Sequence, residues 1–270
     1  MSIDFSGVFV ILLAVGAVIL ILDGLLWGPR RRRTGAKAQP SALVQNARSL
    51  VPILLVVLVL RSFIVEPFRI PSASMMPGLV DGDFIFVNKF SYGLRLPLVN
   101  TKILSVGSPQ RGDVVVFRLP KDVQVDYVKR VVGLPGDRIQ MKEGQLYIND
   151  APVKREPIAD YVGAACGSET TGKIKRWRET LPDGASYETL DCVDKGFYDN
   201  TNVYTVPAGH YFMLGDNRDN STDSRVLSAV GYIPFANLVG RAEVIFFSRG
   251  EAENGAPATV RTERTGTLVR

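Results

Sequence analysis

The hydrophobic pattern divides this 270-residue chain into an apolar amino-terminal part and a longer part of short apolar runs. Phe5 to Leu22 carries no charge, and with the residues that follow it reaches the roughly 20 residues that a membrane-spanning helix needs. A second apolar stretch, Ser49 to Val65, is interrupted by Arg61, whose long side chain can extend to a membrane surface. We therefore predict spanning helices within residues 1–27 and 49–66.

Beyond residue 66 the pattern changes to short β-branched and aromatic runs separated by turn signals such as Leu134-Pro135-Gly136-Asp137. No long stretch has helical spacing. Many short strands with regular turns predict a mainly β domain over 67–270, built as a barrel or sandwich. The runs are Phe84–Val87, Val114–Arg118, Tyr127–Val132, Gln145–Ile148, Tyr211–Leu214 and Glu243–Phe247.

Two parts of this domain differ from the rest. Residues 151–203 are polar and have few long apolar runs, so we expect an inserted subdomain or an extended hairpin there. The tail after Arg249 is rich in Gly, Ala, Thr and Glu, and we expect it to be loosely ordered.

The net charge of +5 comes from the segment 28–48, which has six basic residues and no acidic ones. The rest of the chain is close to neutral, which argues against a broad nucleic-acid-binding face. Because basic loops stay inside, 28–48 is expected in the cytoplasm, with the amino terminus and residues 67–270 outside. A cleaved signal peptide would carry its basic residues before the apolar run, and here they follow it. A basic nucleic-acid-binding tag is the alternative, but the flanking apolar stretches argue against it.

The only two cysteines, Cys166 and Cys192, lie in the exported part. An oxidising compartment permits a disulfide between them, although two unpaired thiols remain the alternative. Their spacing suggests neither a redox motif nor a zinc site.

The chain has a single histidine, His210, in a turn before a strand. We interpret it as a solvated turn residue, so a hydrolase would need another base. Lys129 can serve if burial makes it neutral. Period-two alternation places Tyr127, Lys129 and Val131 on one face and puts Arg130 on the other. The alternative is a pair of exposed edge-strand cations.

A Pro-bracketed loop with two serines follows the second apolar stretch, at Ile70 to Pro77. Such a loop can present one hydroxyl, Ser74, as a nucleophile, while a second hydroxyl, Ser72, and a backbone N–H meet the developing oxyanion. The alternative is a linker leaving the membrane. Met75 and Met76 are unusual for a linker, and an exposed apolar face there would let the domain dip into a bilayer.

The segment from Gly215 to Arg225 is dense in Asp, Asn and Ser. It does not match the register of a calcium-binding EF-hand loop. We expect a hydrogen-bonded loop that supports a site, and we predict neither a metal nor a cofactor.

Together and in this order, these segments resemble bacterial signal peptidase I (leader peptidase) in its Gram-negative form with two membrane helices. The matching blocks are Arg61-Ser62-Phe63-Ile64, Pro71-Ser72-Ala73-Ser74-Met75-Met76-Pro77, Arg111-Gly112-Asp113-Val114-Val115-Val116-Phe117, Tyr127-Val128-Lys129-Arg130-Val131-Val132-Gly133-Leu134-Pro135-Gly136-Asp137 and Gly215-Asp216-Asn217-Arg218-Asp219-Asn220-Ser221 through Asp223-Ser224-Arg225. Gly78 stands where the family usually has Thr, and residues 151–203 do not align.

The resemblance implies a signal-peptidase-like β-barrel or coiled antiparallel sheet with an inserted subdomain. It also implies Ser74 as nucleophile and Lys129 as general base, with the Ser72 hydroxyl and the Ser74 N–H binding the oxyanion. Ser221 resembles the serine that orients the lysine. The support residues implied are Asp223, Arg225 and Arg130.

The family cuts after a small-x-small motif at the end of a signal peptide. By matching position, the first substrate pocket would be lined by Ile70, Met75, Leu79 and Tyr127, the third by Phe68, Val116 and Val128, with Pro71 beside the substrate. Plain core packing is the alternative, above all for Val116. An extended substrate would add as a strand beside 67–72 and the strand of Lys129.

The expected protein is therefore a multi-pass serine endopeptidase of the bacterial inner membrane. Its catalytic domain would lie in the periplasm, and its partners would be preprotein signal peptides and the phospholipid bilayer, without nucleic acid. Two alternatives remain: a self-cleaving Ser–Lys peptidase, and a non-catalytic membrane-tethered β domain for binding or assembly.

Overall fold

The computed structural model describes residues 5–33, 39–95, 102–104, 106–166, 172–250 and 258–270. It divides into two compact units, one drawn from Met1–Val65 and Leu94–Leu104, the other from Glu66–Gly93 and Ser105–Arg270. Parts of three predicted segments lie outside the described residues: 1–4 of the first helix, 34–38 of the basic loop and 251–257 of the tail.

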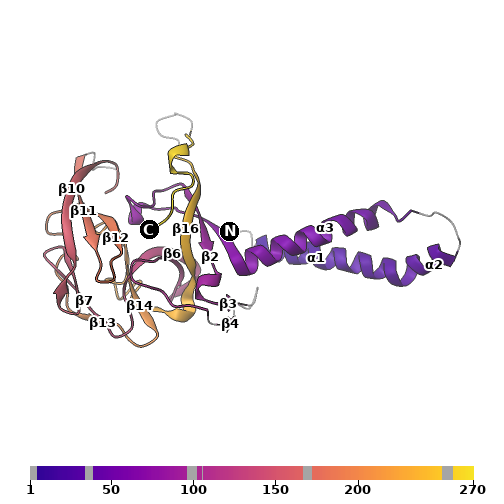
Figure 1. The fold of residues 1–270 in the computed structure, drawn as a ribbon, viewed down its shortest axis with the longest axis horizontal. Coiled ribbons are helices and arrows are strands. Elements are labelled where there is room, and N and C mark those ends of the chain that lie inside the picture. The colour runs from indigo at the N-terminus through magenta and orange to yellow at the C-terminus, as the bar shows by residue number, and fades with distance from the viewer. Residues whose placement is uncertain (1–4, 34–38, 96–101, 105, 167–171, 251–257) are drawn as a thin grey trace. The chain divides into compact units, whose positions relative to one another are not determined.

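The first unit is built around two long helices that lie side by side (Figure 1). Its helices are α1 (Phe5–Leu22), α2 (Gly28–Arg33) and α3 (Ala42–Val59), and its short strands are β3 (Leu94–Arg95) and β4 (Lys102–Leu104). Gly16 allows the close approach, because a Cβ there would lie 2.5 Å from Cγ2 of Val51. Both helices are long and apolar enough to cross a membrane, with mean hydropathies of 2.9 over Gly7–Arg31 and 1.9 over Ala42–Val59.

The first predicted helix and α1 coincide, and a π-helical turn continues α1 through Asp23–Trp27. The second helix begins at Ala42, well before the predicted Ser49. Ser41, the residue before this helix, has an extended ψ of 155° and follows Pro40 in the non-helical segment. Hydropathy marks where a helix can enter a membrane, whereas capping and propensity decide where it begins.

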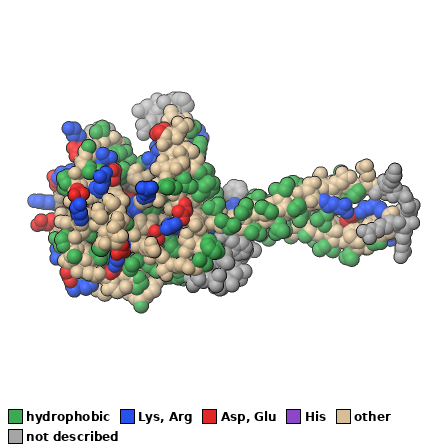
Figure 2. Space-filling model, in the orientation of Figure 1, with side chains coloured by type: hydrophobic (Ala, Val, Ile, Leu, Met, Phe, Trp, Pro, Cys, Tyr) green, Lys and Arg blue, Asp and Glu red, His purple; other side chains and the backbone are tan. Residues whose placement is uncertain are grey.

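Asp23, the one acid of the first apolar region, is 2% exposed. It pairs with Arg31, and Arg48 Nη2 donates to its Oδ2 at 3.1 Å. The basic segment thus supplies the partners that a carboxylate in an apolar helix requires. Hydrophobic side chains cover most of the visible face of the two helices, and basic side chains gather near α2 (Figure 2).

The second unit is built on antiparallel sheets, as predicted. Among the described residues, the main sheet has seven strands in the order β1 (Val65–Arg69), β2 (Asp83–Asn88), β16 (Leu238–Ser248), β5 (Val114–Leu119), β6 (Asp122–Gly133), β14 (His210–Leu214) and β15 (Ile233–Pro234). A four-stranded sheet follows the order β13 (Tyr204–Thr205), β7 (Arg138–Lys142), β8 (Gln145–Ile148) and β9 (Ala151–Pro152). All six predicted runs lie within strands, which confirms the mainly β fold.

Residues 151–203, where we expected an inserted subdomain or an extended hairpin, contain a three-stranded sheet of their own. The order is β10 (Lys154–Gly163), β11 (Gly172–Thr180) and β12 (Ser186–Asp191). In the cluster that this sheet forms with the segment around Ser74, Met76 packs with Ala165, Ile174 and Leu190.

The structure corrects the expected exposed face at Met75 and Met76, which are 1% and 6% exposed. Met75 packs with Ile70 and Leu79 in the core of the main sheet. The exposed apolar surface that we expected at this pair is therefore absent.

The expectation of a loosely ordered tail is wrong for residues 258–270. Ile245 N donates to Thr267 O at 2.9 Å, and Val269 packs against the core cluster that includes Leu79. Arg264 Nε and Nη2 donate to the carboxylate of Asp83 at 2.9 and 2.6 Å. The composition of the tail did not predict its ordered structure, because composition cannot show that Arg264 pairs with the buried Asp83.

Candidate active site

Ser74 lies in a short 3₁₀ turn, Ala73–Met75, which follows β1. Its side chain is buried, at 8% exposure, whereas Ser72 is exposed. The two hydroxyl oxygens are 3.3 Å apart. The loop thus brings two hydroxyls together at the edge of the domain core.

Lys129 comes from the middle of β6, where it pairs with Val115 of β5. Its Nζ lies 2.6 Å from Ser74 Oγ and 3.0 Å from Val128 O, and the residue is 3% exposed. A protonated amine donates in such a contact, while a neutral amine can accept the serine proton.

Burial is the first cause that lowers the pKa of Lys129, from its ordinary value of 10.5 to about 8. The carboxylates of Asp223 and Asp216 oppose this lowering of the pKa, and the charge of Arg225 reinforces it. Desolvation disfavours the charged amine more than these acids favour it. A substantial fraction of Lys129 is therefore neutral at a slightly alkaline pH.

Arg130, the next residue of β6, points to the other face. Its Nε and Nη2 donate to Asp216 at 2.8 and 2.6 Å, and Nη1 donates to Gly112 O at 2.7 Å. The guanidinium also lies 4.1 Å from the ring centre of Tyr187. One cation of the predicted pair is thus neutralised by a carboxylate, while the other faces a serine.

The segment from Gly215 to Arg225 packs directly on the turn of Ser74. A Cβ at Gly215 would lie 2.6 Å from Ser74 O and 2.1 Å from Ser221 Oγ, so this close approach requires glycine. Arg225 Nε and Nη2 donate to Asp223 at 2.9 Å, and Gly215 N donates to Asp223 Oδ2 at 3.0 Å. This buried pair fixes the loop.

Ser221 is close to Ser74 but differs from the expectation in one respect. Its hydroxyl is buried beside the carboxylate of Asp223 and, among the described residues, makes no hydrogen bond to the Lys129 amine. The Lys129 amine is held by Ser74 Oγ and Val128 O instead.

The expected substrate-binding residues fall into two groups. One group is part of the core, with exposures of 2% or less: Ile70, Met75, Leu79 and Val116. The other group is half-buried or exposed: Phe68, Pro71, Tyr127 and Val128. Only the second group presents side-chain surface, so the first can act only as a wall behind it.

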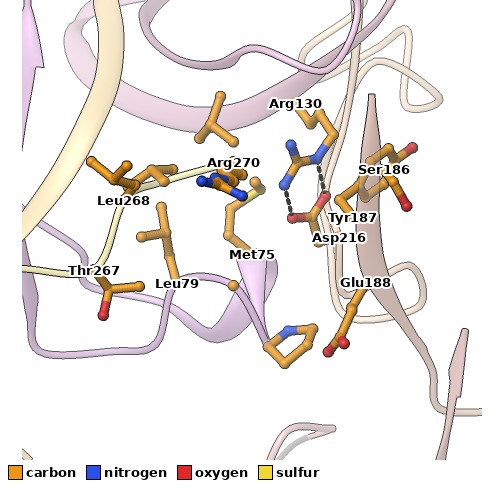
Figure 3. A pocket seen from close by; sticks show the side chains of 14 residues that line it. Met75, Leu79, Arg130, Ser186, Tyr187, Glu188, Asp216, Thr267, Leu268 and Arg270 are labelled. Atoms are coloured by element: carbon orange, nitrogen blue, oxygen red, sulfur yellow. Dashed lines mark hydrogen bonds and ion pairs between the residues drawn. The ribbon is translucent and has the colours of Figure 1, made fainter. Parts of the chain in front are cut away.

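A cavity of about 240 Å³ lies beside the Arg130–Asp216 pair, with Met75, Leu79 and Leu268, a residue near the carboxyl-terminal end, in its walls (Figure 3). Ser74 and Lys129 do not line it. This cavity is therefore separate from the Ser–Lys pair.

Sequence reasoning missed several buried polar residues around the pair. Glu179 of β11 accepts from Arg218 Nη1 at 2.8 Å, and Tyr187 Oη donates to Glu179 at 3.1 Å. The sequence also did not identify Asp216 as the acid that pairs with Arg130. Nothing in the sequence indicated that residues 151–203 would contribute buried polar side chains around the Ser–Lys pair.

Cys166 and Cys192 form a disulfide, with Cα atoms 5.8 Å apart. His210 Nδ1 lies 2.9 Å from Ala208 O in its own turn. We assign no catalytic role to this histidine. Within the described part of the chain, no group of three or more His, Cys, Asp or Glu residues is arranged to hold a metal ion.

Comparison with known proteins identifies the family of this chain. The family model described as signal peptidase, peptidase S26, matches residues 43–247. Signal peptidase I of Pseudomonas aeruginosa is 40% identical, and that of Pseudomonas fluorescens 42%, each over 92% of this chain and 93% of the relative. A crystal structure of a signal peptidase I from Enterococcus faecalis matches 51% of this chain and 98% of its own, with 28% identity and a TM-score of 0.30. The chain belongs to the bacterial signal peptidase I family, peptidase S26.

Proposed function

We propose that this protein is a membrane-anchored serine endopeptidase that removes signal peptides from exported preproteins, with Ser74 as nucleophile and Lys129 as general base. The observation that carries the proposal is the 2.6 Å distance between Lys129 Nζ and Ser74 Oγ, with both side chains buried. The relatives named signal peptidase I support the substrate class.

In the acylation step, neutral Lys129 takes the hydroxyl proton as Ser74 Oγ attacks the carbonyl carbon of the scissile peptide. The Ser72 hydroxyl and the Ser74 N–H meet the oxyanion that forms. The ammonium of Lys129 then protonates the leaving amine, and the C–N bond breaks. In deacylation, Lys129 takes a proton from the water that attacks the ester carbon. The bond between the acyl carbon and Ser74 Oγ then breaks, and the ammonium of Lys129 returns its proton to Ser74 Oγ.

Small-x-small specificity follows from the position of the core wall. Ile70, Met75 and Leu79 are buried in one core cluster, so they leave little depth for a substrate side chain beside Ser74. Overpacking of such a wall costs about 1–3 kcal/mol. Ala-sized side chains avoid this cost.

Two strand edges support binding of an extended substrate. Within the described residues, β1 is an edge strand, and β14 pairs with β6 only at Arg130, Val131 and Gly133. The edge of β6 before Arg130 is therefore open to an added strand. Phe68 on β1 and Val128 on β6 are half-buried there.

The proposed location is the bacterial inner membrane, with α1 and α3 spanning it and the β unit in the periplasm. The length and apolarity of both helices support the anchoring. The basic segment between them supports a cytoplasmic loop.

The test is cleavage of an exported preprotein in vitro by the full-length protein and its variants. Ser74→Ala and Lys129→Ala should each abolish cleavage while the thermal unfolding midpoint is retained. Near-normal cleavage by either folded variant would contradict the dyad, and absence of cleavage by the wild type would favour the non-catalytic binding domain.

The pH dependence provides an independent measurement. Below the Lys129 pKa of about 8, kcat/KM should fall about tenfold for each pH unit, because only the neutral amine accepts the serine proton. Above that pH it should level off. A profile that stays flat from pH 6 to 9 would exclude Lys129 as the base.

A further inference from the structure

The most unusual contacts around the Ser–Lys pair belong to Asn217, which is fully buried. Its side-chain Nδ2 donates to Ala73 O at 3.0 Å and to Ala165 O at 2.6 Å. Its backbone N–H donates to Ser74 O at 3.1 Å. One residue thus binds the carbonyl groups on both sides of the nucleophile.

The orientation of the Asn217 amide is fixed by chemistry. Oδ1 lies 3.1 Å from Sγ of Cys192, and this sulfur carries no proton because it is in a disulfide. In the opposite orientation, Oδ1 would face the carbonyl oxygens of Ala73 and Ala165 without a proton between them. Only Nδ2 can satisfy both carbonyls.

The contact with Ala73 O determines the direction of a neighbouring donor. The Ala73 carbonyl and the Ser74 N–H belong to one planar trans peptide, so they point in opposite directions. Holding the carbonyl therefore holds the N–H. A hydrogen bond accepted by the carbonyl also polarises the same peptide group and strengthens its N–H as a donor.

We infer that Asn217 is a positioning residue that aims the Ser74 N–H at the oxyanion formed during cleavage. The inference rests on the proposed function, in which this N–H is one of the two oxyanion donors. Asn217 touches neither the substrate nor the reacting atoms in this account, and it acts through the peptide between Ala73 and Ser74.

The insertion at 151–203 provides the other anchor of Asn217. Ala165 O accepts its second hydrogen bond, and Ala165 directly precedes Cys166 of the disulfide. Leu190 of β12 forms a bridge with Asn217. The inserted sheet, for which the sequence offered no role, thus provides the fixed support against which the oxyanion donor is aimed.

Asn220 offers a matched control in the same loop. Its Nδ2 donates to the same Ala165 carbonyl at 3.0 Å. Among the described residues it makes no hydrogen bond to Ala73 or Ser74. Substitution of either asparagine by Ala removes a bond to the insertion, but only Asn217 loses the bond to Ala73.

The experiment compares full-length wild type, Asn217→Ala, the isosteric Asn217→Asp and Asn220→Ala. For each, kcat and KM are measured on a preprotein, together with the affinities for a peptide aldehyde and for the cleaved signal peptide. The aldehyde forms a tetrahedral adduct that bears the oxyanion, whereas the product peptide carries none.

For both Asn217 variants, kcat should fall roughly tenfold to a hundredfold, since misplacing a reacting group by about 1 Å costs up to about 10². Aldehyde affinity should fall by a similar factor, while KM and product affinity change less than about twofold. Asn220→Ala should match the wild type in every measurement.

Two results would overturn the inference. One is a folded Asn217→Ala or Asn217→Asp with wild-type kcat and aldehyde affinity. The other is parallel loss of cleavage, aldehyde binding and product binding, which marks a purely structural role or an unfolded variant. A wild type whose cleavage does not depend on Ser74 would instead refute the proposed function.

Discussion

The buried amine of Lys129 should make the protein less stable at neutral pH than an apolar residue of the same length would. Its pKa is about 8 in the folded chain, against 10.5 ordinarily. This difference of about 2.5 in pKa corresponds to about 3 kcal/mol, at 1.36 kcal/mol per unit. The magnitude applies in full because Lys129 is only 3% exposed.

The pH dependence of this cost has a definite sign. Below pH 8 both the folded and the unfolded chain keep the proton on Lys129, so the whole cost is present. Between pH 8 and 10.5 only the unfolded chain keeps it, and the free energy of unfolding rises with pH. Above pH 10.5 both forms are neutral and the cost is gone.

The perturbation is Lys129→Met, and the assay is urea-induced unfolding of the detergent-solubilised protein, followed by tryptophan fluorescence at several pH values from 7 to 10.5. Methionine loses the two hydrogen bonds of the amine, each worth about 1 kcal/mol, so at pH 7 the variant should be more stable by only about 1 kcal/mol. The deciding quantity is the change in that difference. Between pH 7 and pH 10.5, the free energy of unfolding of the wild type should rise by about 3 kcal/mol relative to that of the variant.

Lys154→Met is the matched control, because Lys154 is an exposed strand lysine. Its difference from the wild type should stay constant over the same pH range. Parallel curves for the wild type and Lys129→Met would refute the claim that burial lowers the pKa of this amine. The same result would remove the physical basis of Lys129 as a base.

Three further outcomes are expected. Ser72→Ala should lower kcat by about 10²–10³ with little change in KM, measured by steady-state cleavage; an unchanged kcat would exclude its hydroxyl from the oxyanion site. Arg264→Ala should lower the free energy of unfolding by about 3 kcal/mol, because it removes both close hydrogen bonds from a cation to the buried Asp83 and leaves only Arg261, at 3.9 Å; urea unfolding checks this, and a loss under 1 kcal/mol would show that Asp83 has sufficient other partners. Joint replacement of Cys166 and Cys192 by Ser should cost about 3 kcal/mol, seen as a lower thermal midpoint; an unchanged midpoint would mean that the closed loop contributes nothing to stability.

Local pattern predicted those elements whose formation depends mainly on local sequence. Alternation placed Tyr127, Lys129 and Val131 on one face of β6, and the structure has Tyr127 and Val131 in one cluster. The absence of charge from Phe5 to Leu22 predicted the bounds of α1. Periodicity and hydropathy determine these features, and both can be read from a single sequence.

What sequence could not provide were partners distant along the chain. The fold alone brings Arg264 to Asp83. It likewise brings Arg218 to Glu179. The composition of the tail suggested disorder because it carries no information about Asp83, the buried carboxylate that Arg264 binds and that lies 181 residues earlier in the chain. For the same reason, local sequence left the proposed roles of Ser74 and Lys129 open, and they were proposed only because the order of several blocks indicated a family.

The register of β6 has a consequence for the fidelity of folding. The ladder with β5 is regular from Val114↔Arg130 to Arg118↔Asp126, and its irregularity falls beyond, between Arg118 and Leu119. A slip by one residue would exchange the faces of Lys129 and Arg130. It would place beside Ser74 a guanidinium that cannot give up its proton, and the misfolded sheet would be chemically inert. The main-chain ladder therefore selects which of two adjacent cations can act as a base.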